Sequence, residues 1–108
     1  ASEYKSYMMW RDNPNVAQIA EKRGIKESTV YSHLAAAIRE GWIRVEDVVS
    51  ASSRKALSAG LREVGPQAEL SALVSASPKR VTYGEAACVL AALDVHRAIQ
   101  KRPKANHQ

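Results

Sequence analysis

Glycine and proline divide this chain into short segments, and their spacing constrains the fold more than any other feature. Breaks at Asn13-Pro14, Gly24, Gly41, Gly65-Pro66 and Ser77-Pro78 leave intervals of about 10–18 residues. Intervals of that length suit short helices joined by tight turns. The sequence contains no stretch of about 18 consecutive apolar residues, so no candidate membrane span is present.

Between these breaks, apolar residues recur three and four positions apart, which is the period of a helix. In the segment 27–40, for example, Val30, Leu34 and Ile38 share one helical face. An alternation of apolar and polar residues at 42–45 favours a brief extended segment there. We therefore predict an all-α fold, a small domain of about six helices, with one short extended segment near 42–45.

Three helix starts are marked by residues whose side chains can cap free backbone amides. Asn13 before Pro14 predicts a cap followed by a first-turn proline, and Ser50 is expected to cap the helix that follows it. Thr82 and Glu85 form a Thr-x-x-Glu capping box. The helix that begins there is apolar around most of its circumference, so we expect it to be largely buried.

The 108-residue chain has a net charge of +5 that is unevenly distributed. Residues 1–49 carry seven basic and seven acidic side chains, whereas residues 50–108 carry nine basic and four acidic ones. An excess of this kind attracts polyanions, although a basic tail also suits simple solvation. We divide the chain into one domain, residues 1–100, and a basic C-terminal tail, residues 101–108.

No catalytic or metal site is recognisable in the sequence. Cys88 is the only cysteine, which excludes an internal disulfide and a cysteine-rich zinc site, and we interpret it as a buried thiol. His33, His96 and His107 have no carboxylate at the spacing of metal ligands. A Gly-x-x-x-x-Gly-Lys-Ser/Thr phosphate loop does not occur in the chain. We expect a domain that is not an enzyme and that uses no metal or cofactor.

The most informative segment is VAQIAEKRGIKESTVYSHLAAAIREG, residues 16–41. Ala20 stands four residues before Gly24 and is small enough for a second helix to cross closely. Gly24 can adopt the positive φ that a turn between two helices requires, and Ile25 can fill that turn. This order of a small residue, a turn glycine and an apolar residue predicts a helix-turn-helix.

The second helix of this motif would expose hydroxyl side chains near its start. Such hydroxyls can bond phosphate oxygens, helped by the free amides and the helix dipole. Arg, Asn and Gln are scarce on this helix, so we expect contact with DNA phosphates rather than sequence readout. The candidate DNA-binding residues are Lys26, Ser28, Thr29, Tyr31, Ser32, His33, Arg39, Lys79 and Arg80. Trp42 and Tyr83 suit either core packing or stacking on bases.

The segment IAEKRGIKESTVYSHLAAAIREG is similar to the helix-turn-helix of LuxR-type regulators, which share the IAE–G–TV–HL skeleton. It more closely resembles the helix-turn-helix domain at the C-termini of RecQ-type helicases, including the Werner group. The parts that carry this resemblance are Lys26–Val30 with His33-Leu34, Gly41–Ile43 with Val45–Val49, and Val81–Glu85 with Val89–Ala91. The resemblance as a whole extends over about residues 4–95.

The RecQ resemblance implies a non-catalytic accessory domain of an ATP-dependent DNA helicase that acts in DNA repair, recombination or replication. The motor that binds and hydrolyses ATP would then lie upstream in the parent protein. The implied partners are DNA and either the helicase core or a repair protein, with no membrane. We expect a monomeric, intracellular domain, cytoplasmic in a bacterium or nuclear in a eukaryote. Two alternatives stay open: a protein-interaction module that docks on such a partner, and the DNA-binding domain of a LuxR-type transcription regulator.

Overall fold

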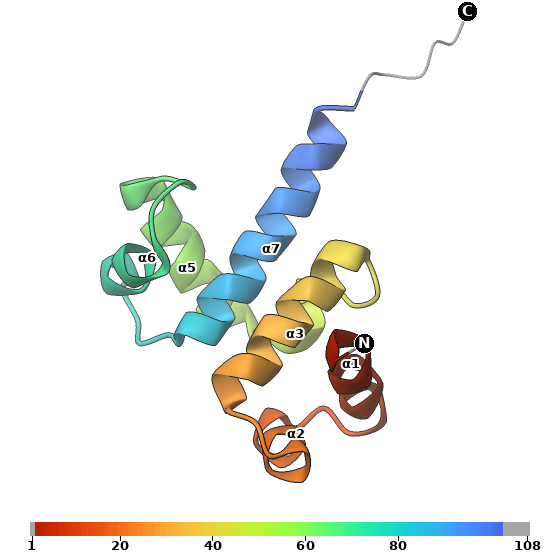
Figure 1. Cartoon of the computed structure of the whole chain (residues 1–108). Helices are drawn as coiled ribbons and strands as arrows, with labels where there is room; N and C mark the ends of the chain where they lie inside the picture. Colours follow the sequence, from red (N-terminus) through yellow and green to blue (C-terminus); the bar gives the residue numbers. More distant parts are fainter. Residues whose placement is uncertain (1, 103–108) are drawn as a thin grey trace, which may run out of the picture.

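The computed structural model describes residues 2–102, and within this range the chain forms helices and no β-strand (Figure 1). The helices in chain order are α1 (Ser2–Asp12), α2 (Val16–Arg23), α3 (Glu27–Glu40), α4 (Val45–Val48), α5 (Ala51–Val64), α6 (Leu70–Ala76) and α7 (Tyr83–Gln100). The all-α prediction is confirmed. Residues 103–108, which make up most of the predicted basic tail, lie outside the described residues.

Most helix ends lie where the sequence predicts them. Gly24 and Gly41 end α2 and α3 in the left-handed conformation, with φ of 65° and 79°. The Ser50 Oγ accepts a bond from the Ser53 amide at 3.2 Å at the start of α5. At the start of α7, Thr82 and Glu85 form both bonds of the capping box, at 3.0 and 2.9 Å.

The start of α2 differs from the prediction. The cap is Asn15, whose Oδ1 accepts a bond from the Gln18 amide at 3.0 Å, and the first helical residue is Val16. Pro14 therefore lies in the connection between α1 and α2 rather than in a first helical turn. Asn13 instead donates from its side chain to Gln18 Oε1, so both asparagines beside the proline support the same turn.

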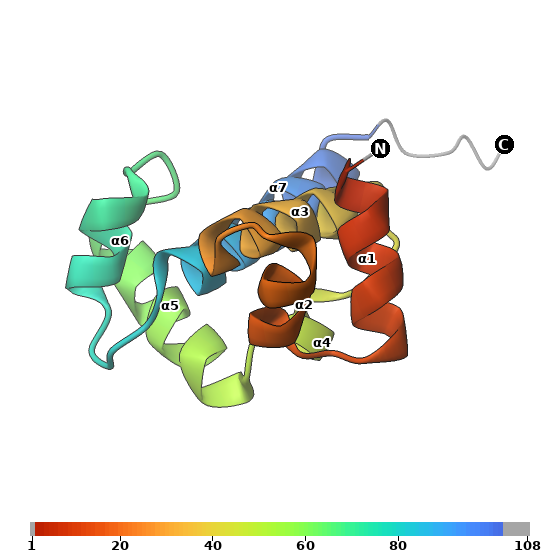
Figure 2. The same cartoon turned by 60° about the horizontal axis from the view of Figure 1, so that its bottom comes forward.

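The central helix of the bundle is α3, which packs against α1, α2 and α7. Val30 and Leu34 are fully buried there, and burying side chains of this size contributes about 1.5–3 kcal/mol each. A second, smaller core joins α5, α6 and the start of α7 through Leu57, Leu73 and Ala86. Figures 1 and 2 place α5 and α6 on one side of α7, and α1 and α2 on the other.

Helices α3 and α7 approach each other closely because α7 has a glycine in its first turn. A Cβ on Gly84 would overlap Cβ and Cγ of Tyr31 on α3. The ring of Tyr31 is therefore fixed against the start of α7. This contact places the N-terminal turns of the two helices side by side, as both views of the ribbon show (Figures 1 and 2).

Two expectations from the sequence are wrong in detail. Residues 42 and 43 form a bend, Arg44 is extended only as the cap of α4, and Val45 begins that helix, so the predicted extended segment near 42–45 is reduced to one residue. Helix α7 is buried only over its first half, since its buried residues are Ala86, Cys88 and Ala91. Its second half continues beyond the other helices (Figure 1). In residues 2–102, none of the helices is both long and apolar enough to cross a bilayer.

Candidate nucleic-acid interface

Helices α2 and α3 and the three residues between them form a helix-turn-helix. Gly24 turns the chain, and the Ile25 amide donates to Ala20 O at 3.0 Å, which closes the end of α2. Ile19 and Ala20 on α2 are buried against the same core as Val30 on α3. The sequence prediction of this unit is therefore confirmed, including the small residue at the helix crossing.

The N-terminal turn of α3 is exposed and has no side-chain cap. Lys26 occupies the capping position and makes no cap hydrogen bond, whereas Asn15, Ser50 and Thr82 cap α2, α5 and α7. The first amides of α3 therefore lack a side-chain acceptor. Free amides at a helix start, with the positive end of the helix dipole and a lysine beside them, favour an anion such as phosphate.

A solvent-facing stripe runs along α3 from this turn. Ser28, Ser32 and Arg39 are exposed, and the Ser32 Oγ donates to the Ser28 carbonyl at 3.1 Å. Thr29 is half-buried beside the stripe. The hydroxyl-bearing side of α3 therefore faces solvent, and it can accept a phosphate backbone without rearrangement of the core.

Two further candidates on α3, Tyr31 and His33, are half-buried and held by packing. Tyr31 lies against Gly84, and burial, with the nearby charges of Glu85, Cys88 and Glu27, raises the pKa of its hydroxyl above the usual 10.0. The Nδ1 of His33 is 2.8 Å from the Oγ of the fully buried Ser6. These two rings flank the exposed stripe and fix its position, because each is tied to a neighbouring helix.

Ser6 connects three helices through its hydroxyl. The Arg23 Nη1 donates to Ser6 Oγ at 2.6 Å and to the Ser2 carbonyl at 2.9 Å. Arginine can only donate, so this bond uses a lone pair of the serine and leaves the hydroxyl proton available for His33. Helix α1 is thereby attached to both helices of the helix-turn-helix, and Arg23 is bound to α1.

Acidic side chains at both ends of α3 offset part of the positive charge along the stripe. At the C-terminal end, Arg39 pairs with Asp94 of α7, with 3.3 Å between Nη2 and Oδ2. Glu27 and Glu40 lie at the two ends of the helix and are exposed. This charge distribution fits one or two phosphate contacts near Lys26 better than a row of base-reading side chains along the helix.

Lys79 and Arg80, the remaining candidates, lie in the connection from α6 to α7 and are exposed. The Lys79 Nζ bonds the Oγ of Ser52 at the start of α5. Arg80 is four residues before Gly84, which contacts Tyr31, so its backbone lies within about 14 Å of that contact by chain length alone. Lys79 therefore belongs to the α5 side of the molecule, and Arg80 is the closer of the two along the chain to Gly84, which contacts Tyr31 of α3.

Three charged residues near the candidate side chains were not predicted from the sequence. Asp94, which pairs with Arg39, is 55 positions away in the chain, and no local pattern marks the pair. Lys55 and Arg62 line a groove with Lys79. Their seven-residue separation on an amphipathic helix was the available signal, since it places them on one face.

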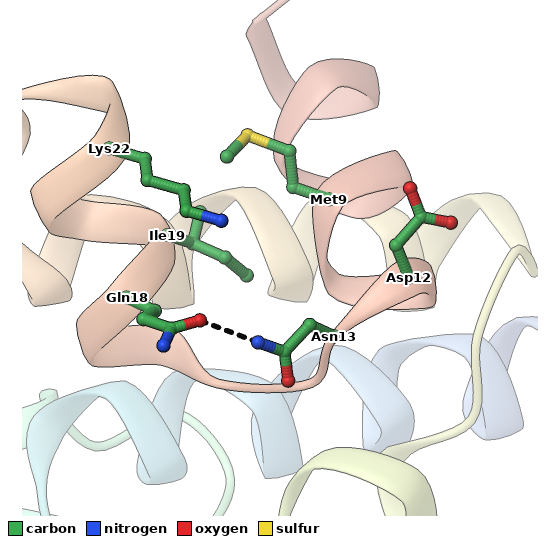
Figure 3. A pocket seen from close by; sticks show the side chains of 6 residues that line it. All are labelled: Met9, Asp12, Asn13, Gln18, Ile19 and Lys22. Atoms are coloured by element: carbon green, nitrogen blue, oxygen red, sulfur yellow. Dashed lines mark hydrogen bonds between the residues drawn. The ribbon is translucent and has the colours of Figure 1, made fainter.

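A cavity lies between α1 and α2, and it is smaller than the usual binding site of a small molecule. Met9, Asp12, Asn13, Gln18, Ile19 and Lys22 surround about 110 Å³, and Figure 3 shows the Asn13–Gln18 hydrogen bond across its edge. Sites for small molecules usually enclose about 300–1,000 Å³. Within residues 2–102, no group of three His, Cys, Asp or Glu side chains is placed to hold a metal ion.

Comparison with known families agrees with this geometry. A family model described as a helix-turn-helix domain matches residues 2–90, from α1 into the middle of α7. The chain belongs to this helix-turn-helix family. Neither the curated proteins nor the solved structures provide a significant match. Membership of the helix-turn-helix family indicates DNA as the partner, since the motif commonly places its second helix against DNA.

Proposed function

We propose that this helix-turn-helix domain binds DNA through phosphates held at the N-terminal turn of α3, and that it is an accessory domain of a RecQ-like helicase. In this role it makes no chemical step. It holds and orients the motor on DNA, while the motor supplies ATP hydrolysis. The resemblance of residues 4–95 to the C-terminal domain of RecQ-type helicases supports the second part of the proposal.

The observation that carries the DNA-binding proposal is the exposed, uncapped start of α3. Lys26 supplies a positive charge, and Ser28 and Ser32 supply hydroxyls that reach the same side. Thr29, Tyr31 and His33 border this surface from half-buried positions, and Arg39 extends it toward α7. The acidic neighbours of Arg39 support binding that is indifferent to sequence.

The test is a titration of labelled duplex and single-stranded oligonucleotides at two salt concentrations. The double variant Lys26→Ala with Arg39→Ala should bind duplex more weakly, and its affinity should depend less steeply on salt, because fewer counterions are released. The matched control is Arg44→Ala with Arg97→Ala, which removes the same charge from other exposed positions. Unchanged affinity in the first variant, at unchanged helix content, would exclude this face.

The helicase part of the proposal has a separate test. Reading the gene upstream of this domain should reveal a motor with a nucleotide-binding phosphate loop in the same frame. A ligand-sensing or receiver domain in that place would instead identify the LuxR-type alternative. Footprinting on a promoter would then show protection of a selected sequence, whereas a helicase accessory domain should protect DNA without regard to sequence.

A protein-docking role is the second candidate, and the free end of α7 favours it. Ile99 is 51% exposed although it belongs to the apolar side of that helix, and Val95 lines a surface hollow with Ile43 and Val45. An apolar strip at this site would suit contact with a helicase core. Binding to the purified motor that persists at high salt, and that Ile99→Asp abolishes, would support this role.

A further inference from the structure

A groove outside the helix-turn-helix combines positive charge with an absence of acids. It lies between α5 and the segment 77–80 and encloses about 270 Å³. Lys55, Arg62 and Lys79 provide its charges, and Ala59 and Pro78 form part of its apolar surface. Among the described residues, no acidic side chain lines it. Within residues 2–102, the ion pairs involve Arg39 and Arg44 and none of these three cations.

We propose that this groove is a second phosphate-binding surface, which holds the backbone of the same DNA that contacts α3. The inference rests on the proposed DNA-binding function and extends it to α5. It assigns ligand-binding roles to Lys55 and Arg62, and it gives Lys79 a defined place in the interface.

The spacing of the cations fits a nucleic-acid strand. Lys55 and Arg62 are separated by seven residues on α5, or about 10.5 Å along the helix axis. A DNA strand carries one charge for about every 3.4 Å of duplex axis, so two cations this far apart can contact different phosphates of one strand. Both side chains are exposed, and they are therefore free to follow a strand that crosses the groove.

Lys79 and Ser52 form a polar part of the groove wall. The Lys79 Nζ bonds the Oγ of Ser52, the second residue of α5, while Ser50 caps the helix by accepting from the Ser53 amide. Because the ammonium group is the donor in that contact, the Ser52 hydroxyl keeps its own proton for another acceptor. An ammonium group and a hydroxyl donor at a helix start together suit one phosphate oxygen.

DNA fits this groove better than an acidic peptide. Tight peptide docking usually depends on an aromatic or large aliphatic anchor in a deep pocket, whereas this groove is shallow and lined by Ala59 and Pro78. The groove is also linked to α3 through Arg80 and the start of α7, which packs on Tyr31. The proposal therefore requires one duplex to contact both the start of α3 and the cations on the α5 side.

The test uses the full chain and a labelled duplex titrated over a range of salt concentrations. The groove variant Lys55→Ala, Arg62→Ala, Lys79→Ala should bind about tenfold to a hundredfold more weakly at low salt, and the slope of log K against log salt should fall by about 2 to 3. The control with equal charge loss, Lys5→Ala, Arg44→Ala, Arg97→Ala, should keep most of the affinity and slope. Circular dichroism verifies folding, and the milder pair Lys55→Gln, Arg62→Gln replaces the triple variant if that one unfolds.

The outcomes separate the two proposals. If the groove variant binds like the parent chain while Lys26→Ala with Arg39→Ala weakens binding, the groove is excluded and the α3 site stands. If only the groove variant weakens binding, the groove stands and the α3 site is excluded. If the parent chain binds no nucleic acid at low salt, both are overturned. If polyglutamate displaces the labelled duplex as strongly as an oligonucleotide of equal charge does, the groove is not a DNA site.

Discussion

At the scale of single residues, one buried serine determines how α1 joins the helix-turn-helix. Ser6 is fully buried, and its hydroxyl lies 2.6 Å from Arg23 Nη1 and 2.8 Å from His33 Nδ1. A serine within a helix carries no signal of burial in the sequence, and its two partners are 17 and 27 positions away. His33 was therefore predicted as a DNA contact, whereas the structure also gives it a packing partner.

We predict that Ser6→Ala lowers the free energy of unfolding by about 1–3 kcal/mol, because the half-buried polar groups of Arg23 and His33 lose their partner. Urea unfolding followed by circular dichroism measures this change. Ser32→Ala is the control, since that hydroxyl is exposed and bonds only within its own helix. Equal midpoints for the Ser6 variant and the parent chain would mean that the hydroxyl does not support the packing.

The thiol of Cys88 predicts how stability depends on alkaline pH. Burial raises its pKa from 9.0 to about 12, with Arg39 lowering it and Glu85 raising it to smaller extents. The unfolded chain therefore loses the thiol proton first as pH rises, so this contribution is complete below pH 9 and is lost toward pH 12.

Unfolding free energy should accordingly fall between pH 9 and 10 by an amount approaching about 1.4 kcal/mol per pH unit. Urea midpoints at pH 8, 9 and 10 measure the decline. Cys88→Ala should show a shallower decline over the same interval, even if its stability at pH 8 is lower. A decline of the same steepness in both proteins would show that Cys88 is not its source.

At the scale of helices, the ends could be predicted from the sequence and the extent of burial could not. A capping box such as Thr82–Glu85 and a turn glycine such as Gly41 act within a few residues, so local sequence contains the information. The burial of α7 depends instead on how far its neighbours extend beside it. Apolar residues such as Ile99 therefore suggest a buried position, although the helix passes beyond its partners there.

The contact between α3 and α7 leads to a prediction that opposes helix propensity. Replacing glycine by alanine inside a helix usually stabilises the helix by about 0.8–1.0 kcal/mol. Gly84→Ala should instead lower the free energy of unfolding by about 1–3 kcal/mol, because the new Cβ overlaps Cβ and Cγ of Tyr31. Thermal unfolding measures the effect. Ser58→Ala, at an exposed position inside α5, is the control and should change stability by less than about 0.5 kcal/mol. A Gly84 variant as stable as the parent chain would disprove the close approach.

At the scale of the whole molecule, the helix-turn-helix was predictable, and the electrostatics around it were not. Residues 16–41 contain both helices and the turn, and hence the exposed hydroxyls of Ser28 and Ser32 follow from local spacing. The pairing of Arg39 with Asp94 depends on how α7 packs on α3. Lys55 and Lys79 line one groove only because the connection from α6 to α7 lies against α5. Net charge alone could not show that the acid-free surface lies on α5.

This arrangement predicts that Asp94 weakens DNA binding by its position across from α3. Asp94→Asn removes a negative charge beside the stripe and frees Arg39 to contact a phosphate. The affinity for duplex DNA at low salt should therefore rise about two- to fivefold, because an exposed ion pair is worth up to about 1 kcal/mol. Stability should change little, since the two side chains are 51% and 59% exposed. In the Arg39→Ala background the same substitution should give a smaller gain, because only the repulsion of phosphate is then relieved. An equal gain in both backgrounds would show that Arg39 itself does not contact DNA, and no gain in either would place the DNA away from this end of α3.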